Sequence, residues 1–165
     1  MDEDENPDYK KLIAALDVDQ RQLADIANFT NNYYPNIELE HELIDPEDIA
    51  SNSPAQLKVR ITRNIDEDDE LKTDVHAPFY PSEKSESWWL VVGDQKEHTL
   101  LAIKKVTVPR KLETMLEFTL EKPGDHELTL YLVSDSYLGV DQAPTFRVSA
   151  AEGMEEDSEE EEEEE

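Results

Sequence analysis

The stretch SWWLVVGDQKEHTLLAIKKVTV, which runs from Ser87 to Val108, contains two apolar runs separated by a polar turn. The first run, SWWLVVG, is apolar at odd and even positions alike, which is typical of an interior strand that is buried on both faces. The second run, TLLAIKKVTV, has the length and the aliphatic content of another short strand. This stretch therefore predicts that the core of the protein is built from β-strands.

The same kind of pattern extends over five more runs, in which apolar and polar residues alternate. In QLKVRITR, for example, Leu57, Val59 and Ile61 lie on one side of the predicted strand. Prolines and turn signals such as KPGD fall between the runs, where a sheet tolerates them. Seven short strands with these spacings predict a mainly β fold, an antiparallel sandwich over residues 36–150. The five further runs are NIELEHELI (36–44), QLKVRITR (56–63), LETMLEFTL (112–120), HELTLYLV (126–133) and TFRVSA (145–150).

Residues 8–34 are predicted to form a short helical hairpin ahead of the sandwich. Asn6 and Pro7 fit the N-cap and the first position of one helix. Asp19 begins a second helix, with Gln22 as its partner in a capping box. Four positions of the second helix follow the spacing of an amphipathic face, namely Leu23, Ile26, Ala27 and Thr30.

The hairpin ends at NNYYPN, because Pro35 prevents the helix from continuing. A helix-turn-helix that reads DNA is the alternative interpretation of such a hairpin. Its second helix would need cations that face the phosphates, and Arg21 is the one basic residue there. The sequence therefore favours a hairpin that packs against protein.

The formal net charge of −27 is concentrated in three acidic segments. We expect an acidic, flexible N-terminus over residues 1–7, a solvated loop at Asp66–Glu70 and a disordered acidic tail over residues 151–165. The tail is a solubilising appendage or a decoy for basic partners, and Ser158 in it is a candidate phosphorylation site for an acidophilic kinase. We expect no tight direct binding of nucleic acid, because affinity for phosphates depends on Lys and Arg.

The chain contains no cysteine, which excludes disulfides and thiolate chemistry and is compatible with a reducing compartment. No apolar run approaches the roughly 18 residues that a membrane-spanning helix requires. The N-terminus, MDEDENP, is acidic where a signal peptide would be basic. These features predict a cytosolic or nuclear protein that does not engage a membrane.

The sequence contains no enzyme motif. It lacks the phosphate-binding G-x-x-x-x-G-K-[ST], the dinucleotide-binding G-x-G-x-x-G and the nucleophile motif G-x-S-x-G. Its four histidines, at positions 41, 76, 98 and 126, share no spacing that suits a zinc site. We therefore expect no catalytic residue, no metal, no cofactor and no small-molecule substrate for this chain.

The stretch YLVSDSYLGVDQ, from Tyr131 to Gln142, places carboxylates close to a glycine and invites comparison with a calcium-binding loop. The spacing fails, because an EF-hand loop that began at Asp135 would need its glycine one position later than Gly139. We interpret the stretch as a turn in which the side chains of residues 134–136 bond turn amides and Gly139 adopts a positive φ. Tyr137 is predicted to lay its ring on the edge of the core, with its hydroxyl bonded to the backbone.

Trp88 and Trp89 are adjacent, so in a strand their side chains point to opposite faces of the sheet. One of them is expected to lie in the core. The other either covers the helical hairpin or forms an exposed anchor for a partner, a role in which tryptophan is over-represented.

Three segments resemble, in the same order, the C-terminal part of the Sec-sixty-three homology unit, and they are YYPNIELEHELID, SWWLVVGDQKEHTLLAIKKVTV and LTLYLVSDSYLGVDQ. This unit is shared by a component of the endoplasmic-reticulum translocon and by large two-cassette helicases. The resemblance covers about residues 9–150. It implies a helix-loop-helix followed by an immunoglobulin-like (fibronectin type III-like) sandwich, which is the order predicted from periodicity. It also implies that ten residues form the structural signature of this domain, namely Trp88, Trp89, Gly93, Asp94, Ser134, Asp135, Tyr137, Gly139, Asp141 and Gln142.

Within this family, the segments VVGD and AIKKVTV favour the spliceosomal RNA helicases of the tri-snRNP. The resemblance implies a nuclear parent enzyme that uses ATP and Mg²⁺ to unwind paired small nuclear RNAs in pre-mRNA splicing. It implies for this chain a noncatalytic accessory and protein-interaction domain. The expected partners are the rest of its own helicase cassette and splicing proteins of the spliceosome.

Two other functions remain open from the sequence. The translocon component of the same family also has an acidic C-terminal tail, and nuclear or reticular localisation of the parent separates the two. An acidic-tailed histone chaperone is the second alternative, because a sandwich with a glutamate run suits basic histones.

Overall fold

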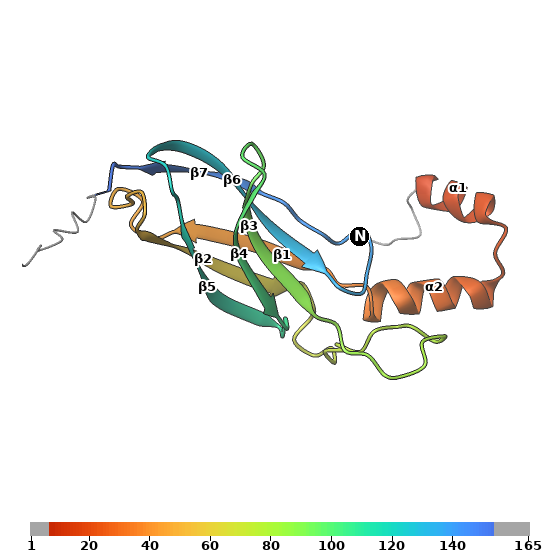
Figure 1. Ribbon diagram of the computed structural model, residues 1–165. Helices are drawn as coiled ribbons and strands as arrows, with labels where there is room; N and C mark the ends of the chain where they lie inside the picture. The colour runs from red at the N-terminus through yellow and green to blue at the C-terminus, as the bar shows by residue number, and fades with distance from the viewer. Residues whose placement is uncertain (1–6, 154–165) are drawn as a thin grey trace, which may run out of the picture. The chain divides into compact units, whose positions relative to one another are not determined.

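The computed structural model describes residues 7–153, which form two helices and seven strands (Figure 1). They divide into two compact units. One contains the helices together with Lys72–Ser85, a segment inside the predicted sandwich range, and the other contains all seven strands. In chain order the elements are α1 (Pro7–Leu16), α2 (Gln20–Asn32), β1 (Ile37–Leu43), β2 (Pro54–Arg63), β3 (Trp88–Asp94), β4 (Thr99–Val106), β5 (Lys111–Thr119), β6 (Gly124–Ser134) and β7 (Thr145–Ala150).

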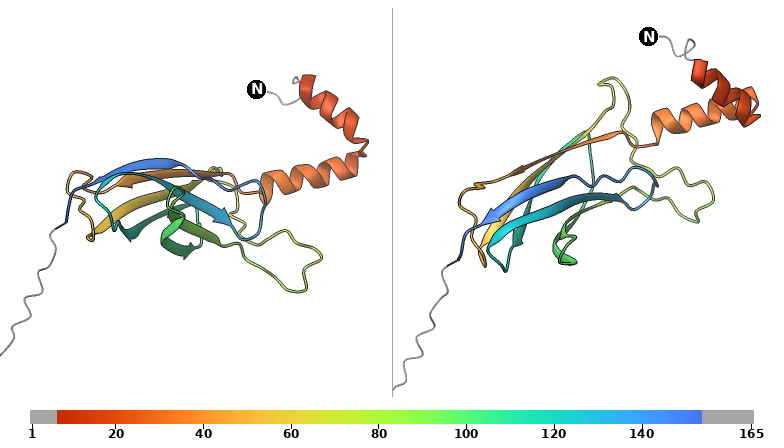
Figure 2. Two further views of the ribbon diagram at one scale, coloured as in Figure 1. Left: turned by 45° about the horizontal axis from the view of Figure 1, so that its top comes forward. Right: turned by 90° about the horizontal axis from the view of Figure 1, so that it is seen from above.

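The strands form two antiparallel sheets, a three-stranded one in the order β1-β2-β5 and a four-stranded one in the order β4-β3-β6-β7. The sheets lie face to face, and Figure 2 shows the two layers from two further sides. This arrangement confirms the predicted mainly β, antiparallel sandwich. The seven strands coincide with the seven predicted runs to within a few residues at each end.

The core lies between the sheets, where β2 and β3 contribute every second side chain. Leu57, Val59 and Ile61 of β2 are fully buried, as their alternation predicts. Trp88 of β3 is buried with them, together with Leu90 and Val92 and with the aliphatic residues of β6, Leu128, Leu130 and Leu132. Burying these large apolar side chains supplies the main driving force for folding of the β unit.

The predicted loop at Asp66–Glu70 is exposed throughout, as its charge requires. Arg110 anchors it by donating hydrogen bonds to the carbonyl of Asp66, at 3.0 Å, and to that of Asp69. The guanidinium therefore bonds the loop backbone and leaves the carboxylates in solvent.

The helical unit begins with Pro7 as the first residue of α1, whereas Asn6, its predicted cap, lies outside the described residues. The capping box predicted for α2 is present. Asp19 accepts a hydrogen bond from the Gln22 N–H at 2.8 Å, and Gln22 Oε1 accepts one from the Asp19 N–H at 2.9 Å. No residue of α2 is buried, so local interactions contribute much of its stability.

An aromatic cluster holds the segment Lys72–Ser85 next to the end of α2. The His76 ring lies 5.5 Å from that of Phe29 and 4.9 Å from that of Tyr33, measured between centroids. Lys72 Nζ lies 5.1 Å from the centroid of Tyr33, in cation–π geometry. The segment therefore belongs to the helical unit although it connects two strands of the sandwich.

Candidate functional site

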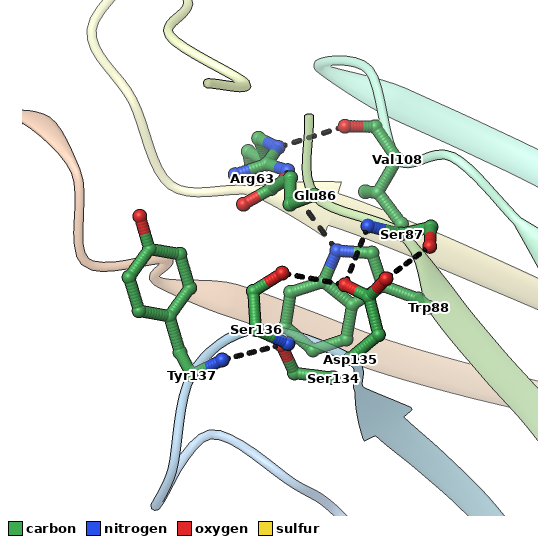
Figure 3. Close-up of polar contacts among 9 residues, drawn as sticks. All are labelled: Arg63, Glu86, Ser87, Trp88, Val108, Ser134, Asp135, Ser136 and Tyr137. Carbon is green, nitrogen blue, oxygen red and sulfur yellow. Dashed lines mark hydrogen bonds and ion pairs between the residues drawn. The ribbon is translucent and has the colours of Figure 1, made fainter. Parts of the chain in front are cut away.

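Asp135 joins the end of β6 to the start of β3 (Figure 3). Its carboxylate accepts hydrogen bonds from the Ser87 N–H, at 2.9 Å, and from the Ser87 hydroxyl, at 2.6 Å. The Asp135 N–H donates in return to the Ser87 carbonyl at 3.0 Å. Asp135 thus clamps two segments that are 48 residues apart in the sequence.

The turn after β6 is closed by the neighbouring serine. Ser134 Oγ accepts hydrogen bonds from the N–H groups of Ser136 and Tyr137, at 3.1 and 3.0 Å, as the sequence predicts. Gly139 has a φ of 81°, the positive value expected of it. The Asp135 carboxylate also has partners that the sequence did not predict, namely the N–H and hydroxyl of Ser87 across the sheet and the Ser136 hydroxyl.

Two further signature residues tie this turn to the rest of the sandwich. Asp141 accepts a hydrogen bond from the Ser134 N–H at 2.9 Å. Gln142 exchanges two backbone hydrogen bonds with Leu132, and its side-chain amide donates to the carbonyl of Ile37 at 2.7 Å. The turn therefore contacts both sheets, since Ile37 begins β1.

A buried ion pair lies beside the clamp, formed by Arg63 at the end of β2 and Glu86 just before β3 (Figure 3). Arg63 Nε donates to the carbonyl of Val108 at 2.9 Å, and Glu86 accepts from the Trp88 indole N–H at 3.4 Å. Burial lowers the pKa of Arg63 below its ordinary value, and the nearby Tyr137 opposes this shift. Tyr137 itself is buried, whereas the expected bond of its hydroxyl to the backbone stays a prediction.

Asp94 ends β3 and caps the turn toward β4. Its carboxylate accepts from the N–H groups of Lys96, at 2.9 Å, and Glu97, at 3.0 Å. His126 Nδ1 lies 3.7 Å from the other carboxylate oxygen. The pKa of Asp94 is lowered, first by the Glu97 hydrogen bond and then by those from Lys96 and His126, which together outweigh the opposing effect of burial.

Trp88 and Trp89 point to opposite faces of the four-stranded sheet, as predicted. Trp88 is fully buried, whereas 36% of the Trp89 surface is exposed on the outer face. Lys105, its cross-strand partner on β4, places Nζ 5.4 Å from the centroid of a Trp89 ring. An exposed tryptophan with a cation above it has the composition of an interface anchor.

The helical unit also presents apolar side chains to solvent. The exposed fraction is 49% for Leu16 at the end of α1 and 45% for Ile26 on α2. Phe79, in the segment that packs against α2, is 99% exposed. These three side chains are the candidates for a contact surface on this unit.

The polar groups of the clamp bond one another, so their arrangement holds strands together. Within residues 7–153, no group of three or more His, Asp or Glu side chains is placed to hold a metal ion. Neither helix of this part of the chain is long and apolar enough to cross a membrane. Ser158, the candidate phosphorylation site, lies outside the described residues.

Sequence reasoning missed the Arg63–Glu86 pair and the exposed apolar residues of β4. A signal for the first was present, because Arg63 continues the alternation of Val59 and Ile61 and so falls on the buried face. A buried arginine requires a buried partner. The partner comes from another segment, and alternation within one strand cannot identify it.

The two-layer β unit and the helical unit define a class of domain, an antiparallel sandwich preceded by two helices. The chain belongs to the Sec63 Brl domain family, whose model matches residues 7–147. It is 42% identical over 152 residues to the pre-mRNA-splicing factor brr2 of Schizosaccharomyces pombe, covering 92% of this chain and 7% of that protein. It is 39% identical over 139 residues to the U5 small nuclear ribonucleoprotein 200 kDa helicase of Homo sapiens, covering 84% of this chain and 6% of that protein.

A plant relative shows the same relation. The DExH-box ATP-dependent RNA helicase DExH12 of Arabidopsis thaliana is 39% identical over 162 residues, which cover 94% of this chain and 7% of that protein. These findings confirm the resemblance to spliceosomal helicases. The chain spans less than a tenth of the length of each of these relatives.

Among solved structures, the CARDB domain of a Pyrococcus furiosus protein in complex with di-metal ions aligns with a TM-score of 0.46 and 13% identity. The alignment covers 73% of this chain and 96% of that chain. A similarity of this size does not bear on the function of the present chain.

Proposed function

We propose that the chain is a noncatalytic accessory and protein-interaction domain of a spliceosomal ATP-dependent RNA helicase that acts in the nucleus. The observation that carries this proposal is the 39–42% identity to helicases and splicing factors over most of this chain but 6–7% of theirs. ATP, Mg²⁺ and unwinding of paired small nuclear RNAs belong to the rest of such a protein. This chain takes no cofactor or small-molecule substrate of its own.

The helical unit is the surface that docks on the remainder of the helicase chain. Because α2 buries none of its own residues, its apolar face gains stability when another part of the protein covers it. Ile26 and Leu16 are the side chains to be covered, and each is about half exposed. Asp135, Ser134 and the other signature residues hold the sandwich together and contact no ligand. The splicing proteins contact the surface of the sandwich.

The docking proposal is tested by mixing the full 165-residue chain with the Schizosaccharomyces pombe relative from which the matching segment has been deleted. We expect a complex in pull-down and calorimetry experiments. Ile26→Glu should weaken it at least about tenfold, because a carboxylate would be desolvated at the contact. The matched control, Ile103→Glu on β4, should bind like the unchanged chain.

Two results contradict the docking proposal. One is the absence of any complex, and the other is a complex that Ile26→Glu leaves unchanged. Circular dichroism of both variants confirms that they remain folded, since both substituted side chains are about half exposed in the structure.

The noncatalytic assignment is tested with the same chain alone. Its net charge of −27 predicts no binding of single-stranded RNA at about 10 μM protein in fluorescence anisotropy at moderate salt. The lack of a phosphate-binding G-x-x-x-x-G-K-[ST] motif predicts no RNA-stimulated ATP hydrolysis. Submicromolar RNA binding that persists at high salt, or turnover of ATP, would overturn the assignment.

A further inference from the structure

We infer that the edge strand β4 and the outer face beside it bind an extended segment of a partner protein, one whose apolar side chains alternate and are followed by an acidic residue. This inference deepens the protein-interaction role proposed above and rests on it. It uses another surface than α2, however, so the two can fail separately. We call this surface the β4 face, and it consists of Trp89, Val91, Leu100, Ile103, Lys105 and Tyr131.

The strand pairing places these side chains on one side of the sheet. On β3, Trp88, Leu90 and Val92 are fully buried in the core, so the residues between them point outward. Cross-strand pairing brings Ile103 beside Val91 and Lys105 beside Trp89. On the other side of β3, Tyr131 of β6 lies beside Val91.

The apolar members of the β4 face are exposed to solvent although 35% of the residues of the chain are charged and could have occupied this surface. The exposed fraction is 59% for Leu100 and 56% for Ile103, and both lie on the outermost strand of the sheet. Together with Trp89, which is about one-third exposed, they form a strip of apolar side chains on the outer face of the sheet. Strips of this kind mark protein contacts.

A shallow hollow of about 470 Å³ lies at one end of the strip, between Leu100 and Tyr131. Gly93 lines it, and since glycine has no side chain, the sheet there is uncovered. A Cβ at this position would lie 3.7 Å from Tyr131 Cε2 and 3.5 Å from the Thr99 carbonyl oxygen, both ordinary contacts. Gln95 donates a hydrogen bond to the Tyr131 hydroxyl at 2.6 Å, and this bond holds the Tyr131 ring in place along one side of the hollow. The hollow suits one aliphatic side chain of a partner.

β4 also offers backbone groups. It is the first strand in the order β4-β3-β6-β7, and in the part of the chain that the structure describes it pairs with β3 alone. Its outer row of N–H and C=O groups is therefore available for a further strand. One side chain bridges β4 to β5, since Lys104 Nζ donates to Thr114 Oγ1 at 2.7 Å and to the Met115 carbonyl at 3.4 Å, and an added strand has to pass beside this contact.

Charge selects the kind of partner. Lys105 lies over Trp89 at the end of the strip opposite the hollow, where an acidic residue of the added strand would meet it. A second copy of the chain would carry another net charge of −27 into the complex. The geometry therefore favours a different protein that supplies an apolar and acidic extended segment.

The test uses the full chain and a synthetic peptide of about ten residues, long enough to cover a strand of ordinary length. In this peptide Val, Leu and Ile alternate with Ser and Thr and are followed by two Glu. A second peptide carries Lys in place of the Glu residues, and a third carries Pro in place of the Ser and Thr residues, which removes backbone donors. Binding is followed by Trp fluorescence and by amide chemical shifts.

We expect the first peptide to bind with a Kd below about 1 mM and to shift the amides of β4. Ile103→Lys should weaken binding at least about tenfold. Gly93→Ala, which fits its surroundings and partly fills the hollow, should weaken it several-fold. Lys105→Glu should reverse the preference between the acidic and the basic peptide.

The control variant is Phe79→Ser, which removes an even more exposed apolar side chain from the helical unit and should leave peptide binding unchanged. The inference is overturned if no peptide binds at about 1 mM, if the proline peptide binds as tightly, or if the shifted amides belong to α1 and α2. It is also overturned if the chain forms a dimer that Ile103→Lys abolishes, because the occupant is then a second copy. The docking of α2 is unaffected by any of these results.

Discussion

Asp135 is an exposed residue, yet it satisfies buried groups. Its carboxylate bonds both the N–H and the hydroxyl of Ser87, a residue that is itself buried, and it also accepts from the Ser136 hydroxyl. A buried N–H that loses its acceptor costs about 1–3 kcal/mol, more than the net gain from an ordinary hydrogen bond. The clamp therefore acts on stability through the residue it bonds.

Asp135→Ala should lower the free energy of unfolding by about 1–3 kcal/mol, and Asp135→Asn by less, because Asn keeps one acceptor oxygen. Urea denaturation followed by Trp fluorescence measures both. Asp125→Ala, at an exposed position of β6, is the control and should stay within about 0.5 kcal/mol of the unchanged chain. Equal effects at positions 135 and 125 would show that the clamp contributes nothing.

Asp94 makes stability depend on pH in a defined direction. Its pKa is lowered in the folded state, chiefly by the Glu97 N–H, so the folded state favours the ionised carboxylate more than the unfolded state does. This contribution is complete above the unfolded pKa of about 4 and is lost as the pH falls through the folded pKa. On acidification, the unchanged chain should therefore lose more of its free energy of unfolding than the Asp94→Asn variant does.

The measurement compares unfolding free energies of the two proteins between about pH 6 and pH 3. We expect a difference of about 1 kcal/mol at the upper end that shrinks toward the lower end. Asp125→Asn, which removes an exposed carboxylate of β6, serves as the control for the substitution itself. A gap between Asp94→Asn and the unchanged chain that grows on acidification would contradict the direction of the pKa shift.

Among the elements, α2 depends on its cap to an unusual degree, since it buries no side chain of its own. Asp19→Ala removes the acceptor for the Gln22 N–H and should cost about 1 kcal/mol of helix stability. Native-state hydrogen exchange should show faster exchange over α2 and unchanged exchange in β2. If the amides of α2 keep their protection, packing rather than the cap stabilises this helix.

The elements themselves were largely predictable from the sequence. A period of two places Leu57, Val59 and Ile61 on one face, and burial of that face follows because the residues between them are charged. The cap of α2 was predictable for the same reason, since both of its residues lie within one turn. Contacts between distant segments were not. Nothing in the sequence around Asp135 identifies Ser87 as its partner. Nothing around His76 indicates that its ring contacts an aromatic residue of α2.

For the whole molecule, the division into two units has an energetic consequence. The sandwich is stabilised by fully buried side chains such as Ile61, whereas no side chain of α2 is buried and Ile26 is about half exposed. Local stability therefore differs between the units, and the helical unit should open without unfolding of the sandwich. The docking proposed above would order the helical unit and leave the sandwich as it is.

Ile61→Ala tests this division, because the cavity it leaves should cost the sandwich about 2–5 kcal/mol. Hydrogen exchange of the core amides of β2, β3 and β6 should accelerate together by the corresponding factor, since they open only by global unfolding of that unit. The amides of α2 should not change, because they already exchange through a local opening. Ile26→Ala, the matched change at an exposed position, should leave the sandwich amides as they are. If Ile61→Ala accelerates α2 and the sandwich equally, the two units unfold as one.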